Sequence, residues 1–343
     1  MTGDRQHGGL PMIGYYVHHQ GRGHLHRALA VAEHCSTPVT VLSSLERPDH
    51  WQAEWVELPR DDTPARSDDT TAHGRLHWVP VHHAGLRTRM STVSAWIERR
   101  RPTLLVSDVS VEVTLLARLL GVPVVAVAMR GDRRDPAHEL AYDIADALLA
   151  PWPAALPEPG WPDHWTKKTL WTGGFSRFDH RLHRHPHHPR TVLLMLGAGG
   201  HDITEAQIDA ARDATPNWHW QVLGGPAGWT PDPWPVLTSA EVIVTHGGQN
   251  AIAECAAARR PTIVLPQDRP YHEQHATARA LQHAGLAVVV PDGWPAPERW
   301  PGLLARAAAH DGRRWARYAP GDGAERAAHA LERLASDRAP VPA

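Results

Sequence analysis

Blocks of apolar and polar residues alternate along this chain, and they predict strands and helices in turn. Short runs rich in Val, Ile and Leu end at polar or glycine-containing loops, and segments with apolar residues three or four positions apart follow them. Strands that alternate with helices are typical of parallel sheets covered by helices. We therefore expect an α/β fold with strands at 13–17, 39–42, 103–107, 123–128, 191–196, 218–223, 242–245, 262–265 and 286–290.

The same order of strand, glycine loop and helix opens each half of the chain. A strand at 13–17 and a glycine-broken loop at 18–24 precede the first helix, and a strand at 191–196 and a glycine loop at 197–201 precede a helix at 204–214. Because each half opens with the same topology, the sequence predicts two open-sheet domains. The expected organisation is a first domain at 1–171, a linker at 172–189, a second domain at 190–318, and a C-terminal helix with a tail at 319–343.

Two stretches lack a sustained hydrophobic period. Residues 46–92 read as irregular, and a long loop of this kind is either functional or a solvated insertion. Its acid pairs, Asp61-Asp62 and Asp68-Asp69, do not follow an apolar strand, so we interpret them as surface groups rather than a metal site. Residues 151–189 are rich in Pro, Trp and His, and we interpret them as a domain junction.

The most informative stretch runs from 242 to 278. An apolar run reaches the turn His246-Gly247-Gly248, and a helix opens near Gln249 and Asn250. Two glycines let a ligand approach the backbone, and the start of the helix presents free N–H groups and the positive end of its dipole. A phosphate is the natural occupant of such a turn. Polar groups that could bind a ribose and a sugar follow at Glu254 and at Glu273-Gln274.

Composition narrows the class of protein. A formal net charge of −2 over 343 residues provides no basic field that would recruit nucleic acid. Cys35 and Cys255 are far apart in sequence and outside any C-x-x-C, which favours a reduced, cytoplasmic protein. Apolar runs of transmembrane length and a signal-peptide core are missing from the sequence, so a cytoplasmic location is expected. With 26 histidines in the chain, a single histidine is weak evidence for a site.

Two segments resemble those of a known enzyme group. The segment HGGQNAIAEC…RRPTIVLPQDRPYHEQHATA resembles the donor-binding signature of GT-B glycosyltransferases, above all the family 28 C-terminal domain, and also the nucleotide-sugar signature of family 1. The loop HHQGRGHLHRALAVA is similar to the first glycine loop of these enzymes, in which G-x-G-H precedes an apolar helix. The resemblance covers both halves of the chain but is specific only in these two segments. It implies a GT-B fold, with two Rossmann-like domains facing each other across a cleft.

The resemblance also implies roles for the donor side. The diphosphate would be held by His246, Gly247, Gly248, Gln249 and Asn250, with Gly199 and Gly200 closing over it. The ribose would be held by Glu254, and the hydroxyls of the sugar by Gln267, Glu273 and Gln274. Trp234 is a candidate to lie near the base, and the alternative is an ordinary packed tryptophan.

On the acceptor side, the resemblance implies that His24 is a general base that removes the proton of the attacking hydroxyl. Asp108 resembles the acid that orients this base, although an Asp after a strand also caps the next helix. His18 and His19 compete with His24 for the role of base. The loop residues expected around the acceptor are His19, Gly21, Arg22 and Gly23.

The implied reaction is an inverting, metal-independent transfer from a nucleotide sugar, UDP-linked by resemblance, to the hydroxyl of an unidentified small molecule, glycan or lipid-linked acceptor. A helix start would stabilise the leaving diphosphate, so neither a metal ion nor a cofactor is expected. Contact with nucleic acid is not expected, and peripheral contact with a membrane stays open. The alternatives are a non-hydrolysing UDP-sugar 2-epimerase and a non-catalytic protein that binds nucleotide sugars.

Overall fold

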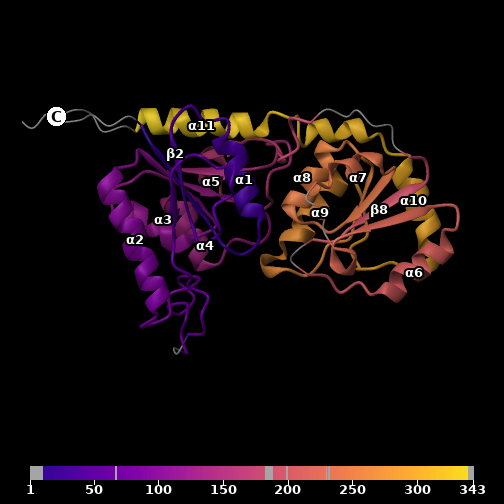
Figure 1. Cartoon of the computed structure of the whole chain (residues 1–343), viewed down its shortest axis with the longest axis horizontal. Helices are drawn as coiled ribbons and strands as arrows, with labels where there is room; N and C mark the ends of the chain where they lie inside the picture. Colours follow the sequence, from indigo (N-terminus) through magenta and orange to yellow (C-terminus); the bar gives the residue numbers. More distant parts are fainter. Residues whose placement is uncertain are drawn as a thin grey trace, which may run out of the picture.

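The computed structural model describes residues 11–65, 68–181, 188–197, 200–228, 230 and 232–338. In Figure 1 two α/β domains lie side by side, each with helices packed around a sheet. Within the described residues, every strand pairing of the two sheets is parallel, and the sheet orders are β3-β2-β1-β4-β5-β6-β7 and β12-β11-β10-β8-β9. The predicted α/β class with two parallel sheets is confirmed.

The first sheet is covered by helices that alternate with its strands along the chain. Its strands are β1 (Ile13–Val17), β2 (Val39–Ser43), β3 (Trp55–Glu57), β4 (Leu104–Asp108), β5 (Val124–Val127), β6 (Ala147–Ala150) and β7 (Thr169–Trp171). The helices are α1 (Gly23–Ala32), α2 (Ala84–Arg100), α3 (Val111–Leu119), α4 (Pro136–Ile144) and α5 (Asp163–Lys167).

The second sheet repeats this arrangement over the second half of the chain. Its strands are β8 (Thr191–Met195), β9 (His219–Leu223), β10 (Val242–Thr245), β11 (Thr262–Val264) and β12 (Val288–Val289). The helices are α6 (Glu205–Ala214), α7 (Trp234–Ser239), α8 (Gln249–Ala257), α9 (Glu273–His283) and α10 (Trp300–Ala308), and α11 (Gly323–Asp337) follows. No described helix is both long and apolar enough to span a bilayer.

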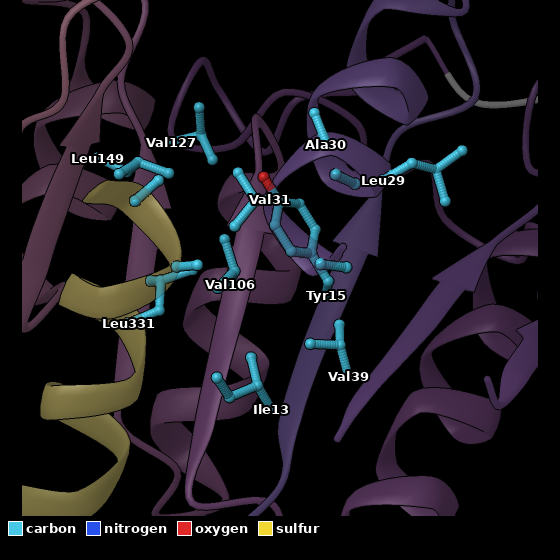
Figure 2. Close-up of a cluster of buried hydrophobic side chains, with 14 of the residues drawn as sticks. Ile13, Tyr15, Leu29, Ala30, Val31, Val39, Val106, Val127, Leu149 and Leu331 are labelled. Atoms are coloured by element: carbon cyan, nitrogen blue, oxygen red, sulfur yellow. The ribbon is translucent and has the colours of Figure 1, made fainter. Parts of the chain in front are cut away.

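The central strands are buried on both faces, as parallel sheets require. All five residues of β1 are buried, and the register of the sheet places Tyr15 between Val41 of β2 and Val106 of β4. Figure 2 shows Tyr15 and Val106 in the apolar cluster on one face of this sheet, with Leu29 and Val31 of α1 close by.

The last helix packs on the first domain and not on the second. Leu331 of α11 lies near Val106 and Leu149 of the first sheet (Figure 2), and the buried side of α11 is otherwise built from alanines and one glycine. Glu332 accepts a hydrogen bond of 2.7 Å from the backbone N–H of Thr37. The chain therefore crosses back over the first domain after it completes the second, as Figure 1 also shows.

The stretch 46–92 contains more structure than predicted. It holds β3, and α2 begins at Ala84, inside the stretch that reads as irregular. The buried residues of α2 are Arg89, Val93, Trp96 and Ile97, so the one buried residue in the first half of the helix is an arginine. Because the hydrophobic pattern treats an arginine as exposed, it misses the first half of this helix.

The interpretation of 151–189 as a junction overlooks the packing of its first part. Trp152, Trp161 and Trp165 pack edge to face with one another or with Tyr142, in a buried cluster that also contains Ile252 and Ala256 of α8. This segment is therefore a packed part of the first domain that also contacts the second. Composition misled the prediction, since tryptophans without a regular period can still form a buried cluster. The histidine-rich positions 183–187 lie outside the described residues.

Candidate functional site

Two cavities, each of about 630 Å³, lie at the ends of the strands where parallel sheets bind ligands. The first cavity is lined by residues that follow β1, β4 and β5, and by Tyr271 and Glu273 of the second domain. The second cavity is lined by residues that follow β8, β10, β11 and β12. Residues 267–269 line the second cavity and residues 270–273 reach the first, so one short segment separates the two.

His24 lies on the wall of the first cavity, in the first turn of α1. Its Nδ1 is 2.9 Å from Oδ1 of Asp108, which ends β4 and is fully buried. Nδ1 also lies 3.0 Å from Nη2 of Arg27, which can only donate. When Nδ1 carries the proton and donates it to the carboxylate, it makes no hydrogen bond to Arg27, and the neutral imidazole keeps a lone pair on Nε2. The structure therefore brings the two predicted catalytic residues together in the arrangement that a general base needs.

Arg27 is a third member of this group, and the sequence analysis missed it. Its Nε is 3.0 Å and its Nη2 3.2 Å from the two oxygens of Asp108, and its Nη1 donates to Oε1 of Gln249 at 2.7 Å. Arg27 lies on the apolar side of α1, between Leu25 and Ala28, and is buried. An arginine inside the apolar face of a predicted helix was the available signal, because such a charge needs a buried partner.

The charge of Asp108 is held by its two neighbours. Burial raises the pKa of this carboxyl, but the charges of Arg27 and His24 outweigh burial and leave the pKa below its ordinary value. Asp108 therefore stays ionised at neutral pH and can stabilise an imidazolium on His24. It does not cap the next helix, since the side chain of Ser110 caps α3 by accepting from Val113 N–H.

The competing histidines are less suited to act as the base. Burial, with His19 as the next cause, lowers the pKa of His18 to about 3, so His18 is a weak proton acceptor. Burial and Arg89 also lower the pKa of His19, whose ring is stacked on that of His18 with centroids 4.7 Å apart. Neither has a carboxylate as close as the one that contacts His24, because His19 lies 3.7 Å from Asp61 at the nearest.

The glycine loop of the first domain contacts the second domain directly. A Cβ on Gly23 would lie 1.9 Å from Nδ2 of Asn250, so the starts of α1 and α8 meet only because residue 23 lacks a side chain. Gly21, with φ of +85°, has open space around it, and Arg22 precedes α1 without a capping hydrogen bond from its side chain. The loop predicted to face the acceptor thus lies against the helix start predicted to face the donor.

His246 lines the second cavity and fits a ligand-binding role. Its Nδ1 is 2.9 Å from the carbonyl oxygen of Leu265, and its buried Nε2 has no hydrogen-bond partner among the described residues. Burial lowers the pKa of the imidazole. Gly248 precedes α8 without a side-chain cap, so the first N–H groups of that helix are available to an anion.

Gln274 has a structural role that the sequence analysis did not predict. Its Oε1 accepts from Gly247 N–H at 3.1 Å and from Gln267 N–H at 3.0 Å, and its side chain is buried. Gln274 therefore ties the loop after β10 to the loop after β11 and has no amide oxygen left for a sugar hydroxyl. A Cβ on Gly247 would lie 2.7 Å from the carbonyl oxygen of Gln274, so only glycine fits there.

Arg269 adds a positive charge to the second cavity. Its Nη2 donates to the carbonyl of Gly200 at 2.9 Å and to Oε1 of Gln267 at 3.0 Å, joining opposite walls of the cavity. The sequence analysis did not select this residue, although it lies in the segment that carries the resemblance. Gly199, a predicted donor residue, lies outside the described part of the chain.

The structure places Glu254 and Trp234 outside both large cavities. Glu254 is buried and accepts from Nε of Arg177 at 3.1 Å, and burial raises its pKa despite that partner. Trp234 is the first residue of α7 and packs against Phe178, with ring centroids 5.3 Å apart, inside an apolar cluster. Trp234 is therefore the packed tryptophan that the sequence analysis gave as its alternative.

Asp61 is not the surface group that we expected. It is buried, lines the first cavity and lies 3.1 Å from Nη2 of the fully buried Arg89, while Asp62 bonds to Arg60 at the surface. A buried arginine requires a nearby acid, and the irregular pattern of this stretch concealed the pair.

His77, Asp135 and His138 form a group whose possible ligand atoms lie within 4.8 Å of one another. Nδ1 of His138 is 2.5 Å from Asp135, and its Nε2 is 3.3 Å from Nη1 of Arg133. Because a guanidinium can only donate, Nε2 accepts and Nδ1 carries the proton. Asp135 also accepts from the backbone N–H of His138 as the cap of α4, so the group forms a hydrogen-bonded chain rather than an open set of metal ligands.

Comparison with known proteins agrees with this geometry. Residues 230–300 match the model of the glycosyltransferase family 28 C-terminal domain. An uncharacterised glycosyltransferase of Methanopyrus kandleri is 37% identical over 65 residues, which are 19% of this chain and 18% of that protein. The UDP-N-acetylglucosamine–N-acetylmuramyl-(pentapeptide) pyrophosphoryl-undecaprenol N-acetylglucosamine transferase of a Chelativorans species is 37% identical over 71 residues, 20% of this chain and 18% of that protein. The alignments thus span less than a fifth of either relative.

The likeness in structure extends over the whole chain. The solved structure of the glycotransferase of kitacinnamycin has a TM-score of 0.68 at 19% identity and covers 95% of this chain and 99% of that one. Likeness at this identity shows the fold, which is the GT-B fold that the resemblance implied. The resemblance to family 28 is confirmed in the donor-binding segment, where the family match lies.

Proposed function

We propose that this chain, with its GT-B fold and a family 28 donor segment, is an inverting glycosyltransferase that moves a sugar from a nucleotide sugar to an acceptor hydroxyl. The observation that supports this most is the linked group of His24, Asp108, Arg27 and Gln249. In this group His24 lies on the wall of the first cavity beside a carboxylate that could orient it, and Arg27 connects that carboxylate to Gln249 at the start of α8.

In the proposed reaction the acceptor occupies the first cavity with its hydroxyl at Nε2 of His24. The imidazole takes the proton while the hydroxyl oxygen attacks the anomeric carbon from the side opposite the diphosphate. The bond from that carbon to the diphosphate oxygen breaks in the same step, which inverts the configuration. Asp108 holds the imidazole in position and stabilises the positive charge that develops on it.

The donor would bind with its diphosphate at the start of α8. The free N–H groups there and the charge of Arg269 would stabilise the leaving group without a metal ion. The Nδ1–H of His246 donates to Leu265, so Nε2 of the neutral ring would accept a hydrogen bond from the donor. Glu273 would contact the sugar hydroxyls. Glu254 stays our candidate for the ribose, although in this structure it is bonded to Arg177. The UDP-linked donor of the Chelativorans enzyme makes UDP the first nucleotide to test.

A thermal-shift panel of nucleoside diphosphates and nucleotide sugars tests the donor. A ligand at about 100 times its dissociation constant stabilises a protein by roughly 2.7 kcal/mol, which is a measurable shift. We expect UDP or a related diphosphate to raise the unfolding midpoint, and adenosine or inorganic phosphate at equal concentration to have a much smaller effect. A panel in which every nucleotide leaves the midpoint unchanged would contradict the proposal.

Mass spectrometry separates transfer from epimerisation. Incubated with UDP-N-acetylglucosamine alone, a transferase leaves the sugar unchanged, whereas a 2-epimerase produces its epimer. We expect no epimer, because the first cavity leaves room for a separate acceptor beside His24. Appearance of the epimer without any acceptor would favour the epimerase.

A further inference from the structure

The loop that follows β5 in the first domain contacts Glu273 of the second domain, a residue that we propose binds the donor. This loop, residues 130–135, is anchored in the first domain because Nη1 of Arg130 donates to Glu158 at 3.0 Å and Gly131 N–H donates to the same carboxylate at 3.1 Å. Arg130 and Glu158 are both buried. The loop is thus a fixed part of the first domain.

The loop packs closely against Tyr271, in the segment that separates the two cavities. A Cβ on Gly131 would lie 2.2 Å from the carbonyl oxygen of Tyr271, and Asp132 N–H donates to that oxygen at 2.9 Å. Tyr271 and His272 both adopt left-handed backbone conformations, with φ of +61° and +54°, which residues with a Cβ rarely adopt. Two such residues in succession persist only where the surroundings hold them.

Arg133 makes the contact with the carboxylate. Its Nη2 donates to Oε2 of Glu273 at 3.2 Å, and its guanidinium lies 4.4 Å from the centre of the Tyr271 ring. The arginine is buried, whereas Glu273 is partly exposed and lines the first cavity. Oε1 of Glu273 makes no hydrogen bond within the described part of the chain, so one oxygen is held and the other is available to a ligand.

Arg133 is itself positioned by the chain from Asp135 to His138. Nε2 of His138 lies 3.3 Å from Nη1 of Arg133, and Nε of Arg133 donates to the carbonyl of Arg130 at 3.2 Å. Nε, Nη1 and Nη2 of Arg133 therefore each have a hydrogen-bond partner, and together these contacts fix the orientation of the guanidinium. A lysine could not make these contacts together, because its ammonium is a single point of contact.

We infer that Arg133 is a positioning residue that fixes Glu273 for recognition of the donor sugar, so that the first domain controls how the second domain selects its sugar. This inference rests on the proposed function, in which Glu273 contacts the sugar. It predicts that loss of Arg133 weakens binding of the sugar part of the donor and leaves binding of the diphosphate part unchanged.

Calorimetric titration of the full chain with UDP and UDP-N-acetylglucosamine, and in parallel with TDP and TDP-glucose, tests the inference. We expect Arg133→Ala to bind the nucleotide sugar about tenfold more weakly, the effect of one charged hydrogen bond, and the free diphosphate within about twofold of the unsubstituted chain. The matched control is Arg134→Ala, since Arg134 is the next residue, is exposed and, among the described residues, bonds only to the exposed Asp132. It should change neither affinity.

A double-mutant cycle separates positioning from a general loss of structure. If Arg133 acts through Glu273, Arg133→Ala should have little further effect in a Glu273→Gln background. Arg133→Lys, which keeps the charge in the same place, serves if the alanine variant does not fold, and its loss should again be confined to the nucleotide sugar. Effects that add in the cycle, or equal losses for diphosphate and nucleotide sugar, would overturn the inference.

The outcomes also distinguish this inference from the proposed function. If the unsubstituted chain binds none of the four ligands, the proposed donor class fails, and the inference fails with it. If it binds them and Arg133→Ala behaves like Arg134→Ala, the positioning role alone is wrong.

Discussion

The imidazole of His24 lies between a ligand cavity and a buried carboxylate, and that carboxylate is shared with an arginine. Asp108 accepts from Arg27 through both oxygens and contacts His24 through one. Arg27 and His24 together offset the cost of burying Asp108, with Arg27 the larger contributor, so the carboxylate stays charged. Its charge is then available when His24 takes up a proton. At the scale of the residue, this geometry is the one that the proposed base and its orienting acid need, and Arg27 balances the charge of that acid.

Substitution of the base tests this residue-scale arrangement. We expect His24→Ala to lower turnover about 10²–10⁴-fold, the usual contribution of a positioned base, with little change in affinity for the diphosphate. Steady-state rates and a binding titration on the same preparation measure the two quantities. His18→Ala is the control, because the lowered pKa of His18 makes it a poor base and its loss should have a much smaller effect. A His24→Ala enzyme with full turnover would rule out His24 as the base.

At the scale of secondary structure, the start of α8 is the element on which the proposed binding of the donor depends. It follows a glycine turn, lacks a side-chain cap and adjoins the buried Nε2 of His246, which has no partner within the described residues. Gln274 holds the turn to the neighbouring loop, which fixes the direction in which the N–H groups point. The element therefore presents oriented donors to an anion before any ligand arrives, and preorganised donors of this kind replace the charge of a metal ion.

The metal dependence of turnover tests this element. We expect EDTA in excess to leave the rate within about twofold of the untreated enzyme, because in the proposed reaction helix-start N–H groups and Arg269 stabilise the leaving diphosphate. Added Mg²⁺ or Mn²⁺ should have a similarly small effect. Loss of activity with EDTA that Mg²⁺ or Mn²⁺ restores would show that the leaving group needs a cation.

At the scale of the whole molecule, the two domains are joined by more than the linker. Arg27 reaches Gln249, Arg133 reaches Glu273, and Arg177 in the linker reaches Glu254, so these arginines connect the halves. After the second domain is complete, the chain returns to the first domain, where α11 packs. Asp179 lies at this junction, where Ser176 N–H donates to its Oδ2 at 3.1 Å.

The stability of this junction should depend on pH through Asp179. Burial raises the pKa of its carboxyl from 3.8 to about 6, so the folded chain binds this proton more tightly than the unfolded chain does. The contribution of Asp179 to the free energy of unfolding therefore falls as pH rises from about 4 to about 6. By pH 7 the carboxyl is ionised in the folded chain, and the loss of stability is complete. We expect Asp179→Asn to stabilise the protein by about 1–2 kcal/mol at pH 7 and by much less at pH 4.

Urea unfolding of both proteins at pH 7 and at pH 4 measures this difference. The amide oxygen of the substituted side chain can still accept from Ser176 N–H, so the substitution isolates the charge. Asp143→Asn is a useful control, because the pKa of Asp143 is lowered and its substitution should destabilise the protein at pH 7. An Asp179→Asn protein that is equally or less stable at pH 7 would contradict the prediction.

The sequence alone determined the features that depend on neighbours along the chain. The strand, glycine turn and helix from Val242 to Ala257 can be predicted from the local sequence. The same is true of the alternation of strands and helices that indicates the fold class. His24 and Asp108 were singled out by the resemblance to GT-B enzymes and not by the hydrophobic pattern, and their roles stay a prediction. Buried arginines such as Arg89 defeated the pattern, since periodicity counts them as exposed.

Only the tertiary structure decided which groups meet. Arg27 and Gln249 are 222 residues apart, Arg133 and Glu273 are 140 apart, and Thr37 and Glu332 are 295 apart. The free energy of such contacts comes from burial and charge pairing after the domains have packed, and it leaves no period in the local sequence. For the same reason the sequence could not show that Trp234 is packed, that Gln274 ties two loops together, or that the first domain contacts Glu273 through Arg133.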